Sequence, residues 1–246
     1  MQERDQSKGV CLIVGAGDGL GAGLSRVFAA AGHLVCLARK DKGASMALID
    51  GIRAAGGEAH AFSVDARDPE AVLALFDEIE GSLGEIEVVI FNVGAALRAG
   101  ALETSASQYR DLWETNALSG MLVGQNAVRV MLPRARGTVL FTGATASLRG
   151  GAGFSAFAAA KTALRAFAQS LAREFSLQGI HVAHVVIDGG IDSNRLRVHQ
   201  PARAQAAGDQ GLLLPDSIAQ TYLMLHQQPR DAWTFEIDLR PWAERW

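Results

Sequence analysis

The chain has 246 residues, of which 49% are hydrophobic and 20% charged, so it can form one α/β domain with a substantial buried core. Its net charge of −3 gives no basic surface for nucleic acid and no obvious attraction to anionic membranes. The polar start, MQERDQSKG, lacks the apolar segment of a signal peptide, and no apolar run reaches the length of a membrane span, so we expect a cytoplasmic protein.

Short apolar runs, several of them closed by glycine, alternate with helical patterns along the chain. The runs predict strands at 9–17, 33–38, 57–64, 86–94, 137–144, 180–190 and 233–239. The helical patterns predict helices at 19–31, from Asp68-Pro69-Glu70 onward, and at 107–131, 154–177 and 215–227. This alternation is typical of a parallel sheet covered on both faces. Because no linker or repeat divides it, we predict a single doubly wound, Rossmann-type domain over residues 1–246, with about seven strands.

The loop VGAGDGLG (14–21) joins the first predicted strand to the first predicted helix. Glycines there permit a tight turn and a close backbone approach to a pyrophosphate, and the helix N-terminus offers N–H donors to the anion. The loop therefore favours dinucleotide binding. A turn that only packs the helix against the strand is the alternative, and the alternating glycines allow more than one register.

The second predicted strand ends in Ala38-Arg39-Lys40. An acid at this point binds the ribose 2′-hydroxyl of NAD, whereas an arginine can hold the 2′-phosphate of NADP with its planar fork. We therefore predict NADP as cofactor, with NAD as the alternative. Asp18 in the glycine loop argues the other way because its charge could repel the extra phosphate, and both basic residues could simply be solvated strand-end charges.

Together these features resemble the short-chain dehydrogenase/reductase family, and the resemblance covers nearly the whole chain. The family's G-x-x-x-G-x-G loop, its aspartate after the third strand, its N-N-A-G segment, its helical asparagine and its Y-x-x-x-K lysine match, in order, Gly15, Gly19, Gly21, Asp65, Asn92, Gly94, Asn116 and Lys161. The resemblance implies that Asp65 lies against the adenine and that Lys161 hydrogen-bonds the nicotinamide ribose. It also implies a homodimer or homotetramer.

Two positions depart from the family's pattern. The catalytic tyrosine, four residues before the lysine, is replaced by Phe157, and the catalytic serine is replaced by Ala144. The position seven before the lysine, where related enoyl reductases carry their tyrosine, is Phe154. A positioned proton donor typically contributes about 10²–10⁴-fold in rate, and an oxyanion donor about 10²–10³-fold. The usual carbonyl-reduction mechanism should therefore be crippled.

Other side chains could replace the missing tyrosine. Aliphatic hydroxyls are poor acids and would need a relay to Lys161; the candidates are Thr142, Thr145, Ser147 and Ser155. Asp188 stands where the family commonly has proline, beside the nicotinamide, and a carboxyl group in a dry cleft can donate a proton. A helix cap or loop hydrogen bond is the alternative interpretation of Asp188.

The polar segment 191–211 occupies the place of the family's mobile, substrate-covering segment. It contains Arg195, Arg197 and Arg203, which indicate either an anionic substrate or a solvated lid. The partners that we predict are therefore a small-molecule substrate and further copies of this chain, with no nucleic acid and no membrane.

We predict an NAD(P)-dependent oxidoreductase that acts on an unknown small molecule by a non-standard mechanism; the alternative is an inactive nucleotide-binding pseudoenzyme with a sensing or scaffolding role. The catalytic candidates are Asn116, Lys161 and Asp188. The predicted cofactor contacts are Gly15, Asp18, Gly19, Leu20, Gly21, Arg39, Lys40, Asp65, Ala66, Asn92, Gly94, Lys161, Gly189 and Ile191.

Cysteines and histidines carry little further signal. Cys11 and Cys36 lie in apolar strand-like runs, which favours buried free thiols over a disulfide. His181 and His184 lie three apart in a predicted strand and so point to opposite faces. We predict no metal site from the spacing of these ligands.

Overall fold

The computed structural model describes residues 8–208 and 210–244. Seven strands form one parallel sheet in the order β3-β2-β1-β4-β5-β6-β7. In chain order they are β1 (Lys8–Val14), β2 (His33–Arg39), β3 (Ala59–Ser63), β4 (Ile86–Phe91), β5 (Gly137–Thr142), β6 (Ile180–Ile187) and β7 (Glu236–Leu239).

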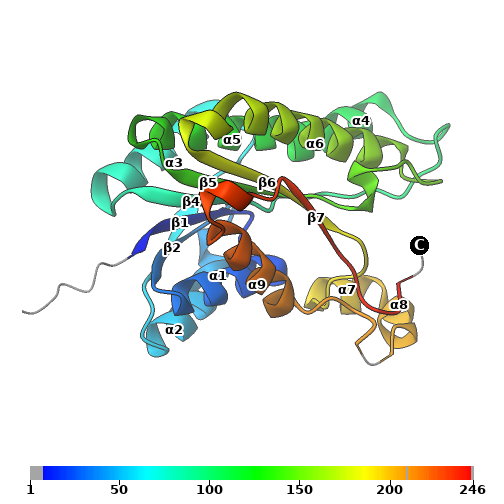
Figure 1. Cartoon of the computed structure of the whole chain (residues 1–246). Coiled ribbons are helices and arrows are strands. Elements are labelled where there is room, and N and C mark those ends of the chain that lie inside the picture. Colours follow the sequence, from blue (N-terminus) through cyan, green and yellow to red (C-terminus); the bar gives the residue numbers. More distant parts are fainter. Residues whose placement is uncertain (1–7, 209, 245–246) are drawn as a thin grey trace, which may run out of the picture.

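Helices cover both faces of the sheet (Figure 1). One face carries α3 (Pro69–Ser82), α4 (Ala106–Trp113), α5 (Ser119–Met131) and α6 (Ser155–Phe175). The other carries α1 (Leu20–Ala30), α2 (Met46–Ala54) and α9 (Pro215–His226). The short helices α7 (Asn194–His199) and α8 (Pro201–Ala206) lie beyond the N-terminal end of α9. This arrangement confirms the predicted doubly wound parallel sheet.

Burial on both faces explains the near-continuous apolar character of the central strands. Every residue of β5 and β6 is buried. Two hydrophobic clusters result, one on each side of the sheet: Leu12 and Phe141 belong to the first, and Ile13 and Leu140 to the second. The alternation of neighbouring residues between clusters follows from the two-residue period of a strand.

The strand order reverses between β1 and β4, because the chain runs outward to β3 and then returns to the other side of β1. Helices on opposite faces leave a crevice at such a switch point, outside the carboxyl ends of the strands. This crevice is where the fold can hold a ligand.

Three local features differ from the sequence predictions. Helix α2 lies between β2 and β3, where we predicted none. It contains Gly51, which disfavours helix, and only Ile49 and Ile52 of its residues are buried, so its pattern is weak. The helix predicted at 107–131 is divided by a π-helical turn at Glu114–Leu118. The polar segment 191–211, to which the sequence patterns assigned no helix, contains α7 and α8.

Both cysteines are buried free thiols, as predicted. Burial raises the pKa of Cys36 to about 12, and that of Cys11 is also raised well above its ordinary value. Among the described residues, no helix is both long and apolar enough to span a bilayer.

Candidate active site

A cleft of about 1520 Å³ opens at the carboxyl ends of the central strands. Every predicted cofactor contact lines it, and so does Asp188. Residues distant in sequence therefore meet in one place, at the switch point of the sheet. Asn116 is the exception among the predicted site residues, because it is buried behind the cleft wall.

Gly15 and Gly21 are needed for close packing of the glycine loop. Gly15 has a φ of +92°, and a Cβ atom there would lie 2.6 Å from the backbone of Asn92. A Cβ at Gly21 would lie 2.7 Å from the Cα of Ala16. Gly17 is different, since a Cβ there would meet nothing within 4 Å among the described residues. The loop thus has a packed floor and an open side toward the cleft.

The amide group of Asn92 fixes the loop against the neighbouring strand. Its Nδ2 donates to the carbonyl oxygen of Gly15 at 3.0 Å, and its backbone N–H donates to Val14 at 2.8 Å. Helix α1 begins at Leu20, so the first N–H groups of an 11-residue helix lie beside this loop. These features fit a pyrophosphate group held by backbone donors.

Charged side chains are paired at the end of β2. Arg39 Nη1 lies 3.1 Å from Asp18 Oδ1 and 3.4 Å from the carbonyl oxygen of Ala16. Asp18 therefore faces the guanidinium group, and its charge is partly matched by Arg39. The nearby Lys40 Nζ lies 2.9 Å from Asp65 Oδ2.

Asp65 also receives hydrogen bonds from Arg67, which the sequence analysis did not single out. Arg67 Nη2 donates to Asp65 Oδ2 at 2.9 Å, and its Nε donates to Oδ1 at 3.2 Å. These bonds, together with Lys40, hold the pKa of Asp65 well below its usual range. Asp65 is thus a fixed anion in the cleft wall. In the sequence, only the Asp-x-Arg spacing of residues 65–67 could have indicated that Arg67 binds Asp65.

The buried Asn116 lies in the π-helical turn between α4 and α5. Its Nδ2 donates to the carbonyl oxygens of Ala95 and Leu112 at 3.0 and 2.9 Å, while its Oδ1 accepts from Ala95 N–H at 3.3 Å. The side chain is therefore held by backbone groups on both sides. It stabilises the segment after β4 that forms part of the cleft wall.

Lys161 projects from α6 into the cleft wall. Its Nζ donates to the carbonyl oxygen of Thr142 at 3.0 Å, and burial lowers its pKa to about 8. A Cβ added to Gly94 would lie 3.7 Å from this ammonium group and 3.8 Å from Asn116 Oδ1. The structure thus brings Gly94, Asn116 and Lys161 together.

Phe157 and Ala144 line the same cleft as Lys161, together with Phe154. None of the three carries a hydroxyl group. Ser147 does not replace the missing serine in this geometry, because it is buried and its Oγ accepts the N–H of Ala144 at 3.1 Å. Thr142 is likewise engaged, since its Oγ1 lies 2.9 Å from the hydroxyl of Tyr222.

Thr145 and Asp188 form the one hydroxyl–carboxylate pair in the described cleft wall. Thr145 Oγ1 donates to Asp188 Oδ1 at 2.5 Å, and Arg240 Nη2 lies 3.4 Å from Asp188 Oδ2. Asp188 is 8% exposed. The carboxylate thus accepts one hydrogen bond and forms a longer ion pair with Arg240, whose guanidinium group also binds Asp238. Arg240 follows β7, and no local pattern in the sequence links it to Asp188.

The segment after β6 packs closely beside this pair. Gly189 has a φ of +149°, and a Cβ there would lie 2.6 Å from Pro241. Ile191 forms a β-bridge with Leu213, which anchors the start of the predicted substrate-covering segment.

Two of the three arginines predicted for substrate binding line the cleft. They are Arg195 and Arg203, and Arg149 joins them from the loop after β5. A Cβ on Gly190 would lie 3.5 Å from Arg203 Nε. Arg197 is instead paired with Asp192 through two contacts of 2.8 Å and does not line the cleft. Only part of the positive charge in segment 191–211 therefore lines the cleft.

The chain is similar in sequence to a known protein family and to several known proteins. A family model described as "short chain dehydrogenase" matches residues 9–203. The chain is 30% identical to the 3-oxoacyl-[acyl-carrier-protein] reductase of Bos taurus over 186 residues, covering 75% of this chain and 76% of the relative. It is 27% identical over 188 residues to the FabG reductase of Escherichia coli K12, covering 76% and 75%.

Two solved structures extend the comparison to nearly the full chain. A short-chain dehydrogenase from Rhodopseudomonas palustris is 40% identical, with a TM-score of 0.82, covering 95% of this chain and 99% of the other. A metagenomic short-chain oxidoreductase in complex with NADP has a TM-score of 0.81 at 23% identity, covering 94% and 96%. The fold and site define an oxidoreductase of the Rossmann class. The chain belongs to the short-chain dehydrogenase/reductase family, whose members bind NAD(P).

Proposed function

We propose that this protein is an NADP(H)-dependent oxidoreductase that acts on a small molecule with a mechanism altered at the proton-transfer step. The observation that carries the proposal is the assembly of Lys161, the glycine loop and Arg39 around one cleft in which Phe157 and Ala144 replace the family's hydroxyl groups. The 3-oxoacyl reductases among the relatives support reaction at a carbonyl group or its alcohol.

The residues of the cleft fit the cofactor. The open side of Gly17 and the N-terminus of α1 suit the pyrophosphate, and Arg39, which lines the cleft at the end of β2, suits a 2′-phosphate. Arg39 uses Nη1 for Asp18, which leaves Nη2 and Nε of its fork for the phosphate. The NADP in the metagenomic neighbour supports the same choice. When bound, the cofactor supplies or accepts a hydride.

Proton movement is assigned to Thr145 and Asp188. The Thr145 hydroxyl lines the cleft and is hydrogen-bonded to Asp188, so a proton can pass from a substrate hydroxyl to Thr145 while Thr145 releases its own proton to Asp188. Carbonyl reduction uses the reverse path. Arg240, which also pairs with Asp238, offsets part of the charge of the carboxylate, and Lys161 supplies positive charge near Thr142.

The substrate is proposed to be anionic. Arg149, Arg195 and Arg203 line the cleft from three elements, and none of them forms an ion pair within the described residues. Changing Arg203 to Gln should raise KM at least tenfold because a charge-assisted contact is lost. Arg197→Gln is the matched control, since Arg197 is paired with Asp192 outside the cleft. Equal KM values for the two variants would exclude this role.

A nucleotide-binding pseudoenzyme is the second candidate. The observation that favours it is the lack of a hydroxyl at Phe157 and Ala144, the two positions where the family carries its catalytic tyrosine and serine. This alternative shares the cofactor cleft but requires no proton path, so cofactor binding alone does not distinguish it.

Assembly into a homodimer or homotetramer remains a proposal from the family resemblance. The small residues of α6 that would permit a close contact between subunits are Ala156, Ala158, Ala159, Ala160 and Ala163. Ala156, Ala158 and Ala160 are buried within the chain itself, whereas Ala159 and Ala163 are half-buried. A contact through α6 would therefore use the side of the helix that carries Ala159 and Ala163.

The first experiment is calorimetric titration of the protein with NADPH and NADH, followed by a carbonyl and alcohol substrate screen at saturating cofactor. We expect tighter binding of NADPH, and Arg39→Ala should lose at least tenfold in NADPH affinity while NADH affinity stays within about twofold. Lys42→Ala is the control, because Lys42 is exposed and lies outside the cleft. Binding without turnover would favour the pseudoenzyme, and no binding of either cofactor would overturn both.

A further inference from the structure

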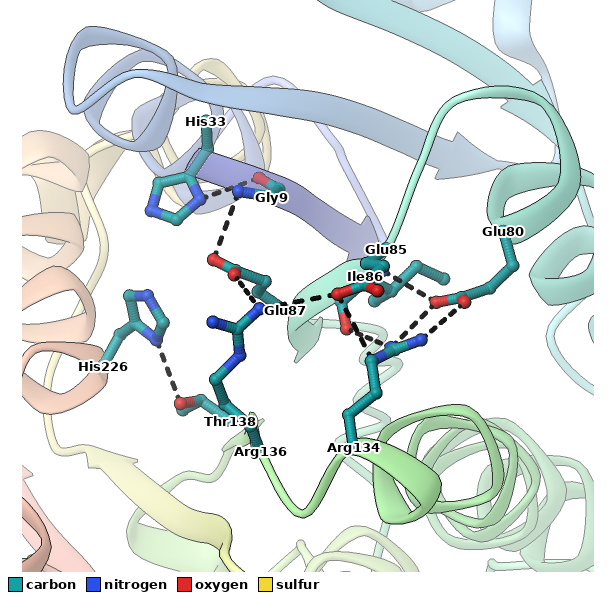
Figure 2. A network of polar contacts seen from close by, with 10 residues as sticks. All are labelled: Gly9, His33, Glu80, Glu85, Ile86, Glu87, Arg134, Arg136, Thr138 and His226. Carbon is teal, nitrogen blue, oxygen red and sulfur yellow. Dashed lines mark hydrogen bonds and ion pairs between the residues drawn. The ribbon is translucent and has the colours of Figure 1, made fainter. Parts of the chain in front are cut away.

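Three side chains with metal-binding atoms meet at the amino-terminal ends of the strands, on the opposite side of the sheet from the cofactor cleft at their carboxyl ends (Figure 2). His33 begins β2, Glu87 lies near the start of β4, and His226 ends α9. One ligand atom from each residue lies within 4.8 Å of the other two. None of the three lines the cofactor cleft. This cluster is independent of the proposed oxidoreductase function.

Hydrogen bonds orient both histidine rings. His33 Nδ1 lies 3.0 Å from the carbonyl oxygen of Gly9, and a carbonyl can only accept, so Nδ1 carries the proton and Nε2 the lone pair. His226 Nδ1 lies 3.0 Å from Thr138 Oγ1. The second nitrogen of each ring points toward the other ring, with the Glu87 carboxylate beside them (Figure 2). Outer hydrogen bonds of this kind hold metal-binding imidazoles in place.

The carboxylate of Glu87 is held in position from two sides. Its Oε2 accepts the N–H of Gly9 at 3.2 Å, and its Oε1 lies 2.7 Å from Arg136 Nη2. A carboxylate oxygen has more than one lone pair, so these contacts do not prevent it from binding a cation. The positive charge of Arg136 nevertheless weakens such binding.

The wider network contains more acid than base. Glu80 and Glu85 accompany Glu87, whereas Arg134 and Arg136 are the arginines that bind them (Figure 2). Arg134 is occupied by Glu80 through contacts of 2.8 and 3.0 Å. Arg136 is shared between Glu85 and Glu87, so Glu87 keeps part of its negative charge beside the histidines.

Ring packing accounts for only part of the arrangement. The rings of His33 and His226 form an edge-to-face contact with centroids 5.2 Å apart, and Phe28 packs on His33 at 5.5 Å. Such contacts explain why the two rings are neighbours. They do not explain why a glutamate carboxylate is directed at the same point.

We propose that His33, Glu87 and His226 bind one Zn²⁺ ion with two imidazole nitrogens and one carboxylate oxygen. This donor set matches zinc, and water can supply the fourth position. Binding requires the ligand atoms to approach to about 3.3 Å from one another, which follows from tetrahedral bonds of about 2.0–2.1 Å. His226 is half-buried at the end of its helix and can make this movement. The ion would tie the end of α9 to the starts of β2 and β4.

The test uses untagged full-length protein that has been stripped with EDTA and dialysed. We expect ZnCl₂ to bind one ion per chain by calorimetry and to raise Tm, because a ligand that binds only the folded state stabilises it. Co²⁺ should give the visible absorption bands of a tetrahedral site. His226→Ala and Glu87→Gln should each weaken Zn²⁺ binding at least tenfold and abolish the Co²⁺ bands.

His60→Ala is the matched control, because His60 pairs with Glu58 at 3.3 Å outside this cluster. It should retain the affinity and the spectrum. Circular dichroism of each variant in EDTA checks that the fold is kept. The proposal is overturned if the wild-type protein shows no saturable Zn²⁺ binding, or if folded His226→Ala binds Zn²⁺ as tightly as the wild type.

Discussion

Thr145 Oγ1 and Asp188 Oδ1 are 2.5 Å apart across the ends of β5 and β6, although 43 residues separate them in the sequence. If this pair moves the proton, Thr145→Val and Asp188→Asn should each lower kcat by about 10²–10⁴-fold. NADPH affinity should change little, because the hydride donor does not depend on this pair. Steady-state kinetics and calorimetry measure the two quantities separately.

Asp192→Asn is the control for this prediction, since Asp192 pairs with Arg197 and does not line the cleft. It should keep the wild-type kcat. A fully active Asp188→Asn would remove Asp188 from the mechanism and leave a water-mediated path or a reaction that needs no protein acid.

Gly15 and Gly17 are two residues apart but should respond differently to alanine. Gly15→Ala places a Cβ 2.6 Å from the backbone of Asn92 at a φ of +92°, so it should destabilise the fold by about 1–3 kcal/mol or more. Gly17→Ala meets open space, so its Tm should stay within about 2 °C of the wild type. The added methyl group should nevertheless weaken NADPH binding, because it narrows the side of the loop that faces the cleft.

Thermal melts and NADPH titrations of both variants check this pair. Equal NADPH affinity for Gly17→Ala and the wild type would show that the pyrophosphate does not approach the loop at this position. A Gly15→Ala protein with unchanged Tm would contradict the packing argument.

The pKa of Lys161 predicts a pH-dependent contribution to stability. Burial lowers this pKa to about 8, below the value of about 10.4 expected in the unfolded chain. Between these values the unfolded state binds the proton and the folded state does not, so the free energy of unfolding rises with pH. The rise is about 3 kcal/mol at full extent.

Urea unfolding at pH 7.5, 9 and 10 measures the effect. Lys161→Met should lack this pH-dependent contribution. The free energy of unfolding of the wild type should therefore rise relative to that of the variant as the pH increases. Lys42→Met is the control, because Lys42 is exposed and its loss should leave the pH profile unchanged. A constant difference between wild type and Lys161→Met would mean that the folded protein does not perturb this lysine.

Local spacing was sufficient to predict the sheet, the glycine loop and Arg39. Asp65, Asn92 and Lys161 were indicated by the resemblance to the family. Each lies next to a strand or within a helix whose pattern is clear, so the topology brings them to the same cleft. The pairing of Asp18 with Arg39 was not foreseen; we had predicted Asp18 as a cofactor contact whose charge could repel a 2′-phosphate.

Contacts between distant elements could not be predicted in this way. Arg240 reaches Asp188 from beyond β7, and the cluster of His33 and His226 combines the start of a strand with the end of a helix far along the chain. The spacing of His181 and His184 argued against a metal site within one strand. Spacing along the chain carries no information on a cluster whose residues come from distant elements. Helix α2 was missed for another reason, since its few buried residues give it a weak pattern.

Restoring the missing hydroxyls tests whether the rest of the site is intact. Ala144 and Phe157 line the cleft with Lys161, so Ala144→Ser combined with Phe157→Tyr places a hydroxyl pair beside the buried ammonium group. The positive charge should lower the pKa of the new phenol and make it an effective proton donor. For carbonyl substrates that Thr145 and Asp188 do not protonate, we expect NADPH-dependent reduction to increase by about 10²–10⁴-fold. Ala144→Ser combined with Phe157→Leu supplies the serine alone and should gain much less. If both double variants stay at the wild-type rate while binding NADPH, the substrate side of the cleft must have been remodelled beyond these two positions.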